Sequence, residues 1–387
     1  MSLEGSEIPC NEVMASEYYA GKRGKTFKTL FGDIRNESRD YYYDRQNKTG
    51  RYPFDNALGL INGSTPALVA RALMHTVKEP YAEAASDFQK CMSRHMTADI
   101  MMTYPRALGK KAELFLGERL SPDRFTPECV YVLADGTGLP LRRKELRGVK
   151  GKGPDGRAKT RETKVGAIFT GHPTPGAPKE RARDPDSTTY VATIERKDAF
   201  AGQLRGEFDR RFTTKPNVTL FIGDGASWLW SIRRTHFPFA VEILDFYHAA
   251  EHLEPILNLA GYKDKKKKRI FKKWRKWLKL GKVAQLIKVT DDLVGKTKEG
   301  RKAIGYFKNN KERMKYDEYL AKGWFIGSGV VESGCKTVIG KRFKQSGMIW
   351  SKKGLRALIP FRIAYMNGRY DELWQYLLSN EKQVQVI

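Results

Sequence analysis

VYVLADGTG, residues 130–138, is a nearly continuous apolar run that ends in Asp135, and the two glycines after it predict a turn. Four more strand-like stretches follow: KVGAIFTG (164–171), TTYVATIE (188–195), NVTLFIGD (217–224) and FAVEILD (239–245). Three of the five are almost wholly apolar, which is typical of strands whose two faces are both covered by helices. The sequence therefore predicts an α/β domain built on a five-stranded sheet.

The pattern becomes helical after Asp245 and stays so to about residue 322. GSG at 327–329 then leads into a second helical stretch, VVESGCKTVIGKRFK, which carries Glu332. A helical insertion is thus predicted to interrupt the sheet domain. The expected division is an N-terminal region (1–62), a helical region (63–125), a sheet domain in two pieces (126–248 and 323–371), the insertion (249–322) and a C-terminal tail (372–387).

The helical region contains several start signals. Thr65 can cap a helix whose first residue is Pro66, Pro80 opens a second helix, and Thr97 is a further cap candidate. Pro105 is predicted to begin another helix. Short helices joined by tight turns indicate a helix-turn-helix-like DNA-binding region, although an ordinary helical bundle has the same pattern.

The chain is strongly basic. It has 71 lysine and arginine residues against 44 aspartate and glutamate residues, a formal net charge of +27. A polyanion is the natural partner of such a chain. Anionic membranes would also attract it, but its apolar runs are shorter than the roughly 18 residues of a spanning helix, and MSLEGSEIPC at the start contains no signal core. We therefore expect a nucleic-acid-binding protein of the cytoplasm, associated with the nucleoid, with no membrane partner.

The four cysteines, Cys10, Cys91, Cys129 and Cys335, lie far apart and form no CxxC pair. Their spacing predicts reduced structural thiols rather than a disulfide framework or a zinc ribbon.

Three acids carry the predicted chemistry. Asp135 and Asp224 end buried strands, and Glu332 lies in the first turns of a helix. A plain strand-to-turn junction would look similar, but carboxylates at buried strand ends are costly unless they face a rim or bind a cation. Together the three could hold two Mg²⁺ or Mn²⁺ ions about 3.5 to 4 Å apart for in-line attack on phosphate. They are the predicted metal ligands and catalytic residues.

Four motifs resemble those of ISKra-type bacterial insertion-sequence transposases: DGTG (135–138), DGASWLW (224–230), ILDFYHAAEHL (243–253) and GSGVVESGCKTVIGKRFKQSGMIWS (327–351). The resemblance covers roughly Phe54 to Trp374. Those enzymes are similar to Mutator-like transposases, with an RNase H-like catalytic domain, a helical insertion and a DDE triad. The resemblance implies that Asp135, Asp224 and Glu332 are the triad. It also implies a role near the active site for the D-x-x-H pair, Asp245 and His248.

His248 could pair with a phosphate or assist proton transfer, or it could simply cap and satisfy the helix that follows. The N-terminal region departs from the family: relatives often have paired cysteines there, whereas this chain has YYYDRQNKTGRYPFD (41–55). That region is at most a degenerate zinc-ribbon-like element.

Basic segments suggest where DNA would bind. The segment 142–164 has ten basic and three acidic residues among its glycines, and further basic residues follow Glu332. A solvated hairpin would look the same, but a cationic loop beside acids suits a phosphate backbone. The predicted DNA-binding residues are Arg142, Arg143, Lys144, Lys150, Lys152, Lys336, Lys341, Arg342 and Lys344.

The insertion contains a second basic run around Phe271, Trp274, Trp277 and Leu278, whose spacing predicts a buried helical face. GCKTVIGKR (334–342) only resembles a phosphate loop, because its glycine spacing is too long and Arg342 stands at the Ser/Thr position.

The leading hypothesis is a DDE transposase that binds the terminal inverted repeats of an insertion sequence, cleaves DNA and joins the 3′ ends to a target. It would work as a homodimer or larger assembly on double-stranded DNA. One alternative is a domesticated or inactive transposase that only binds DNA. Another is an RNase H-like nuclease with a different substrate.

Overall fold

The computed structural model describes residues 16–118, 127–149, 151, 158–172, 182–184, 186–212, 214 and 216–383. The chain divides into two compact units. Unit 1 comprises Met1–Leu116 and Trp350–Ile387, and unit 2 comprises Gly117–Ile349. This division differs from the predicted boundaries, because residues 350–371 belong with the N-terminal helices rather than with the sheet domain.

Unit 1 begins with a three-stranded antiparallel sheet of β1 (Glu17–Lys28), β2 (Asp33–Asp44) and β3 (Thr49–Arg51), followed by the short helix α1 (Pro53–Ala57). The aromatic residues Tyr41, Tyr42 and Tyr43 are part of β2. Tyr18 pairs with Tyr43, and Tyr19 with Tyr42, across the first two strands. Arg39 is buried between the sheet and α1, 3.5 Å from the ring of Tyr52.

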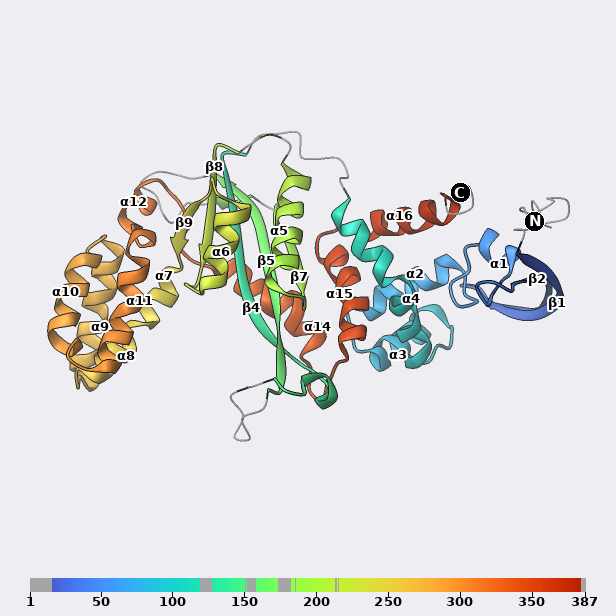
Figure 1. Ribbon diagram of the computed structural model, residues 1–387, viewed down its shortest axis with the longest axis horizontal. Coiled ribbons are helices and arrows are strands. Elements are labelled where there is room, and N and C mark those ends of the chain that lie inside the picture. Colours follow the sequence, from blue (N-terminus) through green and yellow to red (C-terminus); the bar gives the residue numbers. More distant parts are fainter. Residues whose placement is uncertain are drawn as a thin grey trace. The chain divides into compact units, whose positions relative to one another are not determined.

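The helices of unit 1 are α2 (Pro66–Thr76), α3 (Tyr81–Met92), α4 (Ala98–Gly117), α15 (Lys352–Met366) and α16 (Tyr370–Gln383), seen in Figure 1. The backbones of α4 and α15 approach so closely that a Cβ on Gly109 would lie 2.6 Å from the Cα of Ala357. The buried Arg362 donates to the carbonyl of Val77, 2.8 Å away. These contacts explain why the C-terminal helices belong to this unit.

The predicted starts of α2 and α3 are confirmed, since Thr65 and Pro80 are their N-cap residues. The predicted helix start at Pro105 is wrong: Pro105 lies inside α4 and is buried. A proline inside a helix costs about 3 kcal/mol. Buried residues on both sides of it, from Met101 to Phe115, offset that cost.

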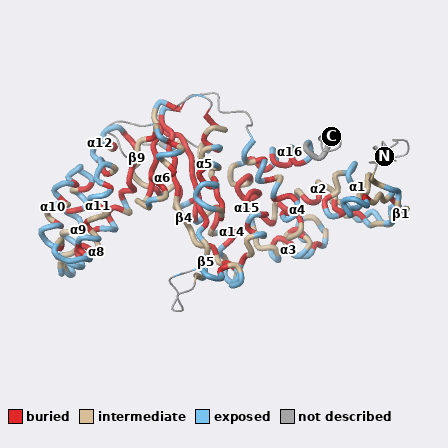
Figure 2. Tube along the Cα trace, viewed as in Figure 1, coloured by how far each residue is buried: buried red, intermediate tan, exposed pale blue. Residues whose placement is uncertain are grey.

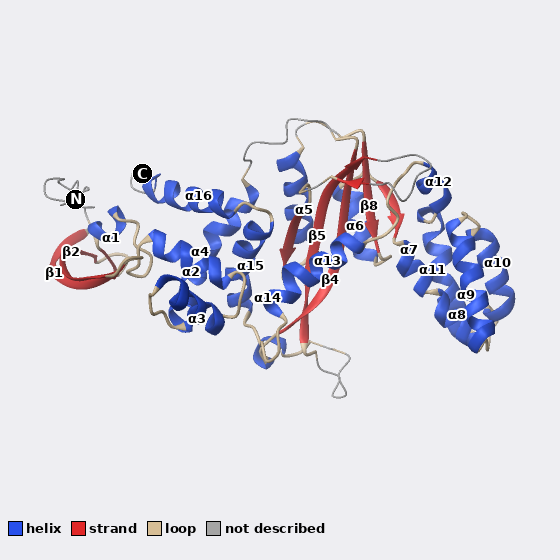
Figure 3. Cartoon of the chain, turned by 180° about the vertical axis from the view of Figure 1, so that it is seen from behind, coloured by secondary structure: helices blue, strands red, loops and turns tan. Residues whose placement is uncertain are grey.

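Unit 2 is built on a six-stranded sheet of β4 (Cys129–Pro140), β5 (Thr160–His172), β6 (Ala182–Arg183), β7 (Thr189–Thr193), β8 (Val218–Gly223) and β9 (Val241–Leu244). The strand order is β6-β5-β4-β8-β9, and β7 also pairs with β5. β4 runs antiparallel to β5 and parallel to β8, which is parallel to β9. All five predicted strands are confirmed, and they form a mixed sheet (Figure 3).

The predicted turn at residues 136–138 is wrong, because β4 continues through it to Pro140 and pairs with β5 along its whole length. Gly136 and Gly138 are therefore strand residues. A Cβ on Gly136 would lie 2.5 Å from Oε1 of Glu162 on β5, so the glycine leaves room for that side chain. The strand ends near η1 (Arg143–Leu146), a short 3₁₀ turn.

Helices cover both faces of this sheet. α5 (Lys197–Arg211) places Leu204 against Gly166 of β5, and α6 (Ser227–His236) packs beside α5. α13 (Gly329–Gly334) contacts Val165, whose side chain points to the opposite face because successive strand residues alternate. Figure 2 shows the resulting concentration of buried residues along the central strands.

The predicted helical insertion is confirmed. α7 (Phe246–Glu251) is followed by α8 (Leu253–Leu259), α9 (Asp264–Lys279), α10 (Val283–Val294), α11 (Lys298–Asn310), the 3₁₀ turn η2 (Lys311–Arg313) and α12 (Tyr316–Ala321). Of the apolar face predicted in α9, Trp274 and Leu278 are buried, whereas Phe271 and Trp277 are only half-buried. The neighbouring Lys272 and Lys276 are exposed.

After α13 the chain continues as a π-helical turn, η3 (Cys335–Gly340), and as α14 (Lys341–Phe343). Among the described residues, no helix is long and apolar enough to cross a membrane.

Candidate functional site

The three aspartates lie at the same level of three neighbouring parallel strands. Leu133 of β4 pairs with Ile222 of β8, and Gly223 of β8 pairs with Leu244 of β9. Continuing these registers places Asp135 beside Asp224, and Asp224 beside Asp245. Neighbouring strands are about 4.8 Å apart. The sheet therefore gathers these residues at one place, where β8 and β9 end.

Asp135 is half-buried in β4. The backbone N–H of Gly136 donates to its Oδ1 across 2.6 Å, and the thiol of Cys335 donates to its Oδ2 across 3.5 Å. Burial raises the pKa of Asp135, and the nearby charge of Asp224 raises it further. The two hydrogen bonds and the charge of His248 lower this pKa, but by less. A carboxylate with a raised pKa beside a second carboxylate is an environment in which a bound cation would stabilise the ionised form.

Asp224 follows the last residue of β8. Its Oδ1 accepts a hydrogen bond from the N–H of Ala226 at 2.9 Å, which closes a tight turn. Gly225 in that turn has φ +101°, a conformation that glycine adopts without strain. The hydroxyl of Tyr306 on α11 donates to the backbone carbonyl of Asp224 at 3.0 Å. Among the described residues, none donates a hydrogen bond to Oδ2 of Asp224, which leaves that oxygen available as a ligand.

Asp245 is in a different situation, since its side chain is fully buried. Its Oδ1 accepts the N–H of His248 at 2.6 Å, which caps α7, and its Oδ2 accepts the N–H of Ser328. Both oxygens are thus used by backbone amides. Asp135 also accepts a hydrogen bond at each oxygen, but it is half-buried, whereas Asp245 has no exposed surface through which to reach a substrate, so the geometry lends no support to the predicted catalytic role. Asp245 instead ties the start of α7 to the GSG loop.

His248 is partly exposed, and its Nδ1 lies 3.5 Å from Oε2 of Glu251. Its charge lowers the pKa of Asp135, so the imidazole lies in the neighbourhood of the carboxylate pair. His252, one turn further along, stacks on the ring of Tyr306 with the ring centres 3.5 Å apart. Burial, and secondarily His248, lowers the pKa of His252 and favours its neutral form.

Glu332 lies on α13, as predicted. Its Oε1 accepts a hydrogen bond from the Ser328 hydroxyl at 2.8 Å. Cys335, one turn later, contacts Asp135. Burial raises the pKa of the Cys335 thiol to about 12, and the charges of Asp135 and Glu332 add to that rise. The helix thus brings Glu332 to the side of the sheet edge that Asp135 occupies.

The donor atoms fit a hard divalent cation, because Asp135, Asp224 and Glu332 all offer carboxylate oxygens. The arrangement is not closed: among the described residues, no three histidine, cysteine, aspartate or glutamate side chains converge into a metal-binding group. Glu332 accepts a hydrogen bond from Ser328, and Asp135 accepts one from Cys335.

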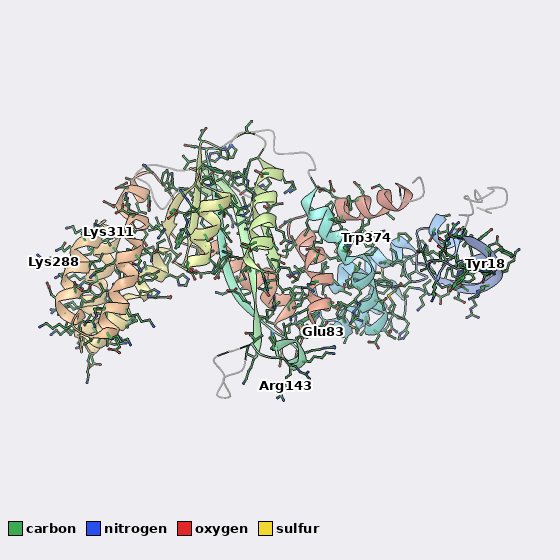
Figure 4. The ribbon with its side chains drawn as sticks, viewed as in Figure 1. Tyr18, Glu83, Arg143, Lys288, Lys311 and Trp374 are labelled. Carbon is green, nitrogen blue, oxygen red and sulfur yellow. The ribbon has the colours of Figure 1, made fainter. Side chains whose placement is uncertain are left out.

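Most of the predicted DNA-binding residues that are described lie on the surface. Arg142, Arg143 and Lys144 are exposed at η1, where Figure 4 shows the side chain of Arg143 extending outward. Lys336, Lys341 and Lys344 are exposed after Glu332, and Lys344 donates to the hydroxyl of Thr137 on β4. Lys150 and Lys152 lie outside the described residues.

The prediction that Arg342 binds DNA does not fit the structure. Arg342 is fully buried, with its guanidinium 5.5 Å from the ring centre of Phe343. The short helix α14 turns it into the core while Lys341 faces outward. A phosphate could not reach this side chain without rearrangement of the helix.

Three residues of the site were missed in the sequence. Cys335 had one signal, its position three residues after Glu332, which places both side chains on one helix face. Ser328 is the middle residue of GSG (327–329), whose sequence gives no sign of its hydrogen bond to Glu332. Tyr306 had no signal, because 82 residues separate it from Asp224.

A search of curated proteins found no match to the chain. A family model, in contrast, matches residues 15–375, which include all of unit 2, most of unit 1 and every residue of the site described above. The chain therefore belongs to the uncharacterised protein family UPF0236.

Proposed function

We propose that this protein is a DDE transposase that binds the ends of an insertion sequence and catalyses metal-dependent DNA strand cleavage and strand transfer. The observation that carries the proposal is the placement of the acids. Asp135 lies on β4 and Asp224 directly after the neighbouring parallel strand β8. Glu332 lies on α13, one turn before Cys335, whose thiol donates to Asp135.

The fold supports the same proposal. A helical insertion lies between the second aspartate and the glutamate, on a mixed sheet with helices on both faces. This is the organisation that the resemblance to ISKra-type transposases implies, including its RNase H-like catalytic domain. In this proposal unit 2 is that catalytic domain, and the helices of unit 1 contribute DNA binding.

Asp135, Asp224 and Glu332 would hold two Mg²⁺ or Mn²⁺ ions. Ions held in this way activate a water or 3′ hydroxyl and stabilise the leaving oxygen of an in-line displacement. Oδ2 of Asp224 is available as a ligand, and Glu332 would exchange its bond to Ser328 for the ion. His248, near the carboxylate pair, would pair with a phosphate or accept a proton.

The exposed lysines would compensate the acids when DNA binds. Lys344 reaches Thr137, two residues after Asp135, and Lys336 and Lys341 are exposed on the same helical segment. Charges at this position would neutralise phosphates on either side of the scissile bond. Such contacts are independent of sequence, so base recognition would have to come from elsewhere in the chain.

The test is cleavage of labelled DNA that carries the sequences flanking the gene for this chain, with Mg²⁺ or Mn²⁺. Wild type should cleave at the element ends, and Asp135→Asn, Asp224→Asn and Glu332→Gln should each lose at least about a thousandfold in rate. Asp291→Asn is the matched control, because Asp291 is an exposed carboxylate of the insertion that pairs with Lys308.

Two other outcomes would replace the proposal. DNA binding without cleavage by any variant would favour a domesticated or inactive transposase. Cleavage of RNA–DNA hybrids or branched DNA in preference to element ends would favour an RNase H-like nuclease of another substrate.

A further inference from the structure

The insertion is attached to the sheet by tyrosine hydroxyl groups. Tyr306 on α11 donates to the carbonyl of Asp224 at 3.0 Å. On α12, Tyr316 donates to the carbonyl of Leu244 at 3.0 Å, and Tyr319 donates to that of Glu242 at 3.1 Å. All three acceptors are backbone carbonyls within or directly after β8 and β9, so the insertion packs against the ends of these strands through a repeated type of contact.

Tyr306 differs from the other two because its acceptor belongs to one of the acids of the site. The turn after Asp224 is shaped around its ring: a Cβ on Gly225 would lie 3.0 Å from Cε2 of Tyr306 and 3.2 Å from its hydroxyl. Glycine at position 225 therefore permits both the positive φ of the turn and the close approach of the tyrosine ring.

The insertion also holds the Tyr306 ring in place. His252 is the N-cap residue of α8. Its imidazole stacks on the Tyr306 ring, with the ring centres 3.5 Å apart and an interplanar angle of 13°. The side-chain amide of Asn310 donates to the carbonyl of Tyr306 at 2.9 Å.

Asp224 is consequently fixed from two sides. The N–H of Ala226 holds its carboxylate, and the hydroxyl of Tyr306 holds its backbone. Groups that orient a ligating carboxylate set how well it binds a cation, although they do not touch the cation themselves. Removing such a group loosens the ligand without changing its chemical type.

We propose that Tyr306 is a positioning residue for Asp224, through which the helical insertion sets the affinity of the site for its divalent cations. The insertion is then a part of the catalytic centre and not only a DNA-binding attachment. This inference rests on the proposed function, since it takes Asp224 as a metal ligand.

The test compares Tyr306→Phe with Tyr319→Phe in the full-length protein. Each variant removes one hydroxyl and keeps its ring: Tyr306 donates to the carbonyl of Asp224 at 3.0 Å, and Tyr319 donates to that of Glu242 at 3.1 Å and lies 3.5 Å from that of Glu312. Mn²⁺ binding is measured from the electron paramagnetic resonance signal of unbound Mn²⁺, without DNA, and urea unfolding reports the stability of each variant.

We expect Tyr306→Phe to weaken Mn²⁺ binding about tenfold, the lower end of the effect of losing such an orienting group. Tyr319→Phe should bind Mn²⁺ as wild type does, although both variants unfold at slightly lower urea concentrations. In the cleavage assay, the kcat of Tyr306→Phe should be lower than that of wild type at subsaturating Mn²⁺ and should return to the wild-type value at high Mn²⁺. The KM for DNA should be unchanged.

Equal Mn²⁺ binding by the two variants, with wild type clearly binding, would overturn the positioning role and leave the proposed function intact. If Tyr306→Phe unfolds, His252→Leu replaces it, since that variant removes only the stacked ring and should still weaken Mn²⁺ binding. Failure of wild type to bind Mn²⁺ or to cleave would instead contradict the proposed function, and with it this inference.

Discussion

The thiol of Cys335 donates a hydrogen bond to Oδ2 of Asp135 across 3.5 Å, between two residues 200 positions apart in the chain. The bond joins the helical segment of Glu332 to the central strand β4. It is also one of the interactions that lower the pKa of Asp135, against the stronger effect of burial, which raises it.

Replacing Cys335 should therefore change the pH dependence of the reaction. In Cys335→Ala the pKa of Asp135 rises further, because a hydrogen bond to its charged form is lost. The carboxylate is ionised only above its pKa, so the acidic limb of the kcat/KM profile should move to higher pH. Cys335→Ser keeps a donor and should keep a profile close to wild type. A profile that is the same in all three proteins would contradict this role of the thiol.

The cysteines should differ sharply in reactivity. Burial raises the pKa of Cys335 to about 12 and that of Cys129 to about 11, from an ordinary value of 9.0. Only the thiolate is alkylated, so at pH 8 Cys335 should have about a thousandfold less of the reactive form than an ordinary thiol. Cys91 is exposed. Iodoacetamide labelling followed by peptide mass spectrometry should modify Cys91 first, and Cys129 and Cys335 only in urea. Early labelling of Cys335 in the native protein would show that its surroundings are not closed.

Asp245 should matter for stability more than for chemistry. Asp245→Ala leaves two backbone N–H groups, those of His248 and Ser328, without their acceptor. An unpaired buried donor costs about 1 to 3 kcal/mol, so the free energy of unfolding should fall by about 3 kcal/mol in urea titrations. Asp291→Asn, at an exposed ion pair, should change it by less than about 1 kcal/mol. A folded Asp245→Ala protein of wild-type stability that has lost all cleavage would instead indicate direct participation.

The basic residues after Glu332 should separate into two classes. Lys341 is exposed, so Lys341→Met should weaken DNA binding at low salt and make the slope of log Kd against log salt shallower by about one. Arg342 is buried, so Arg342→Met should leave that slope unchanged and affect stability. Fluorescence anisotropy over a salt series measures both. A reduced slope in Arg342→Met would show that α14 opens when DNA binds.

The sequence allowed the strands and the helical insertion to be predicted, because buried strands leave long apolar runs and α9 has a regular apolar face. The turn predicted from Gly136 and Gly138 was wrong, because these glycines occupy strand positions where the side chains of Glu162 and Thr160 need room. The helix start predicted at Pro105 was also wrong, because the burial of residues along α4 outweighs the cost of a proline inside the helix. Local sequence does not reveal such compensation.

Long-range contacts account for what the sequence could not show in the site. Asp135, Asp224 and Glu332 could be selected from their local patterns alone. The pairing of Tyr306 with Asp224, and of Asp245 with Ser328, depends on how the insertion and the GSG loop return to the sheet. Asp245 illustrates the limit: its strand-end position matches that of Asp224, yet only the fold shows that both of its oxygens are used by backbone amides.

Strand transfer tests the central claim most directly. Labelled element-end DNA with an exposed 3′ hydroxyl is incubated with a supercoiled plasmid, Mg²⁺ or Mn²⁺, and either wild type or Asp224→Asn, which retains the size of the side chain and the turn at Gly225. We expect metal-dependent joining of the label to the plasmid by wild type, and none above background by Asp224→Asn at equal DNA binding. Joining by both proteins, or by neither while both bind the DNA, would contradict the central claim.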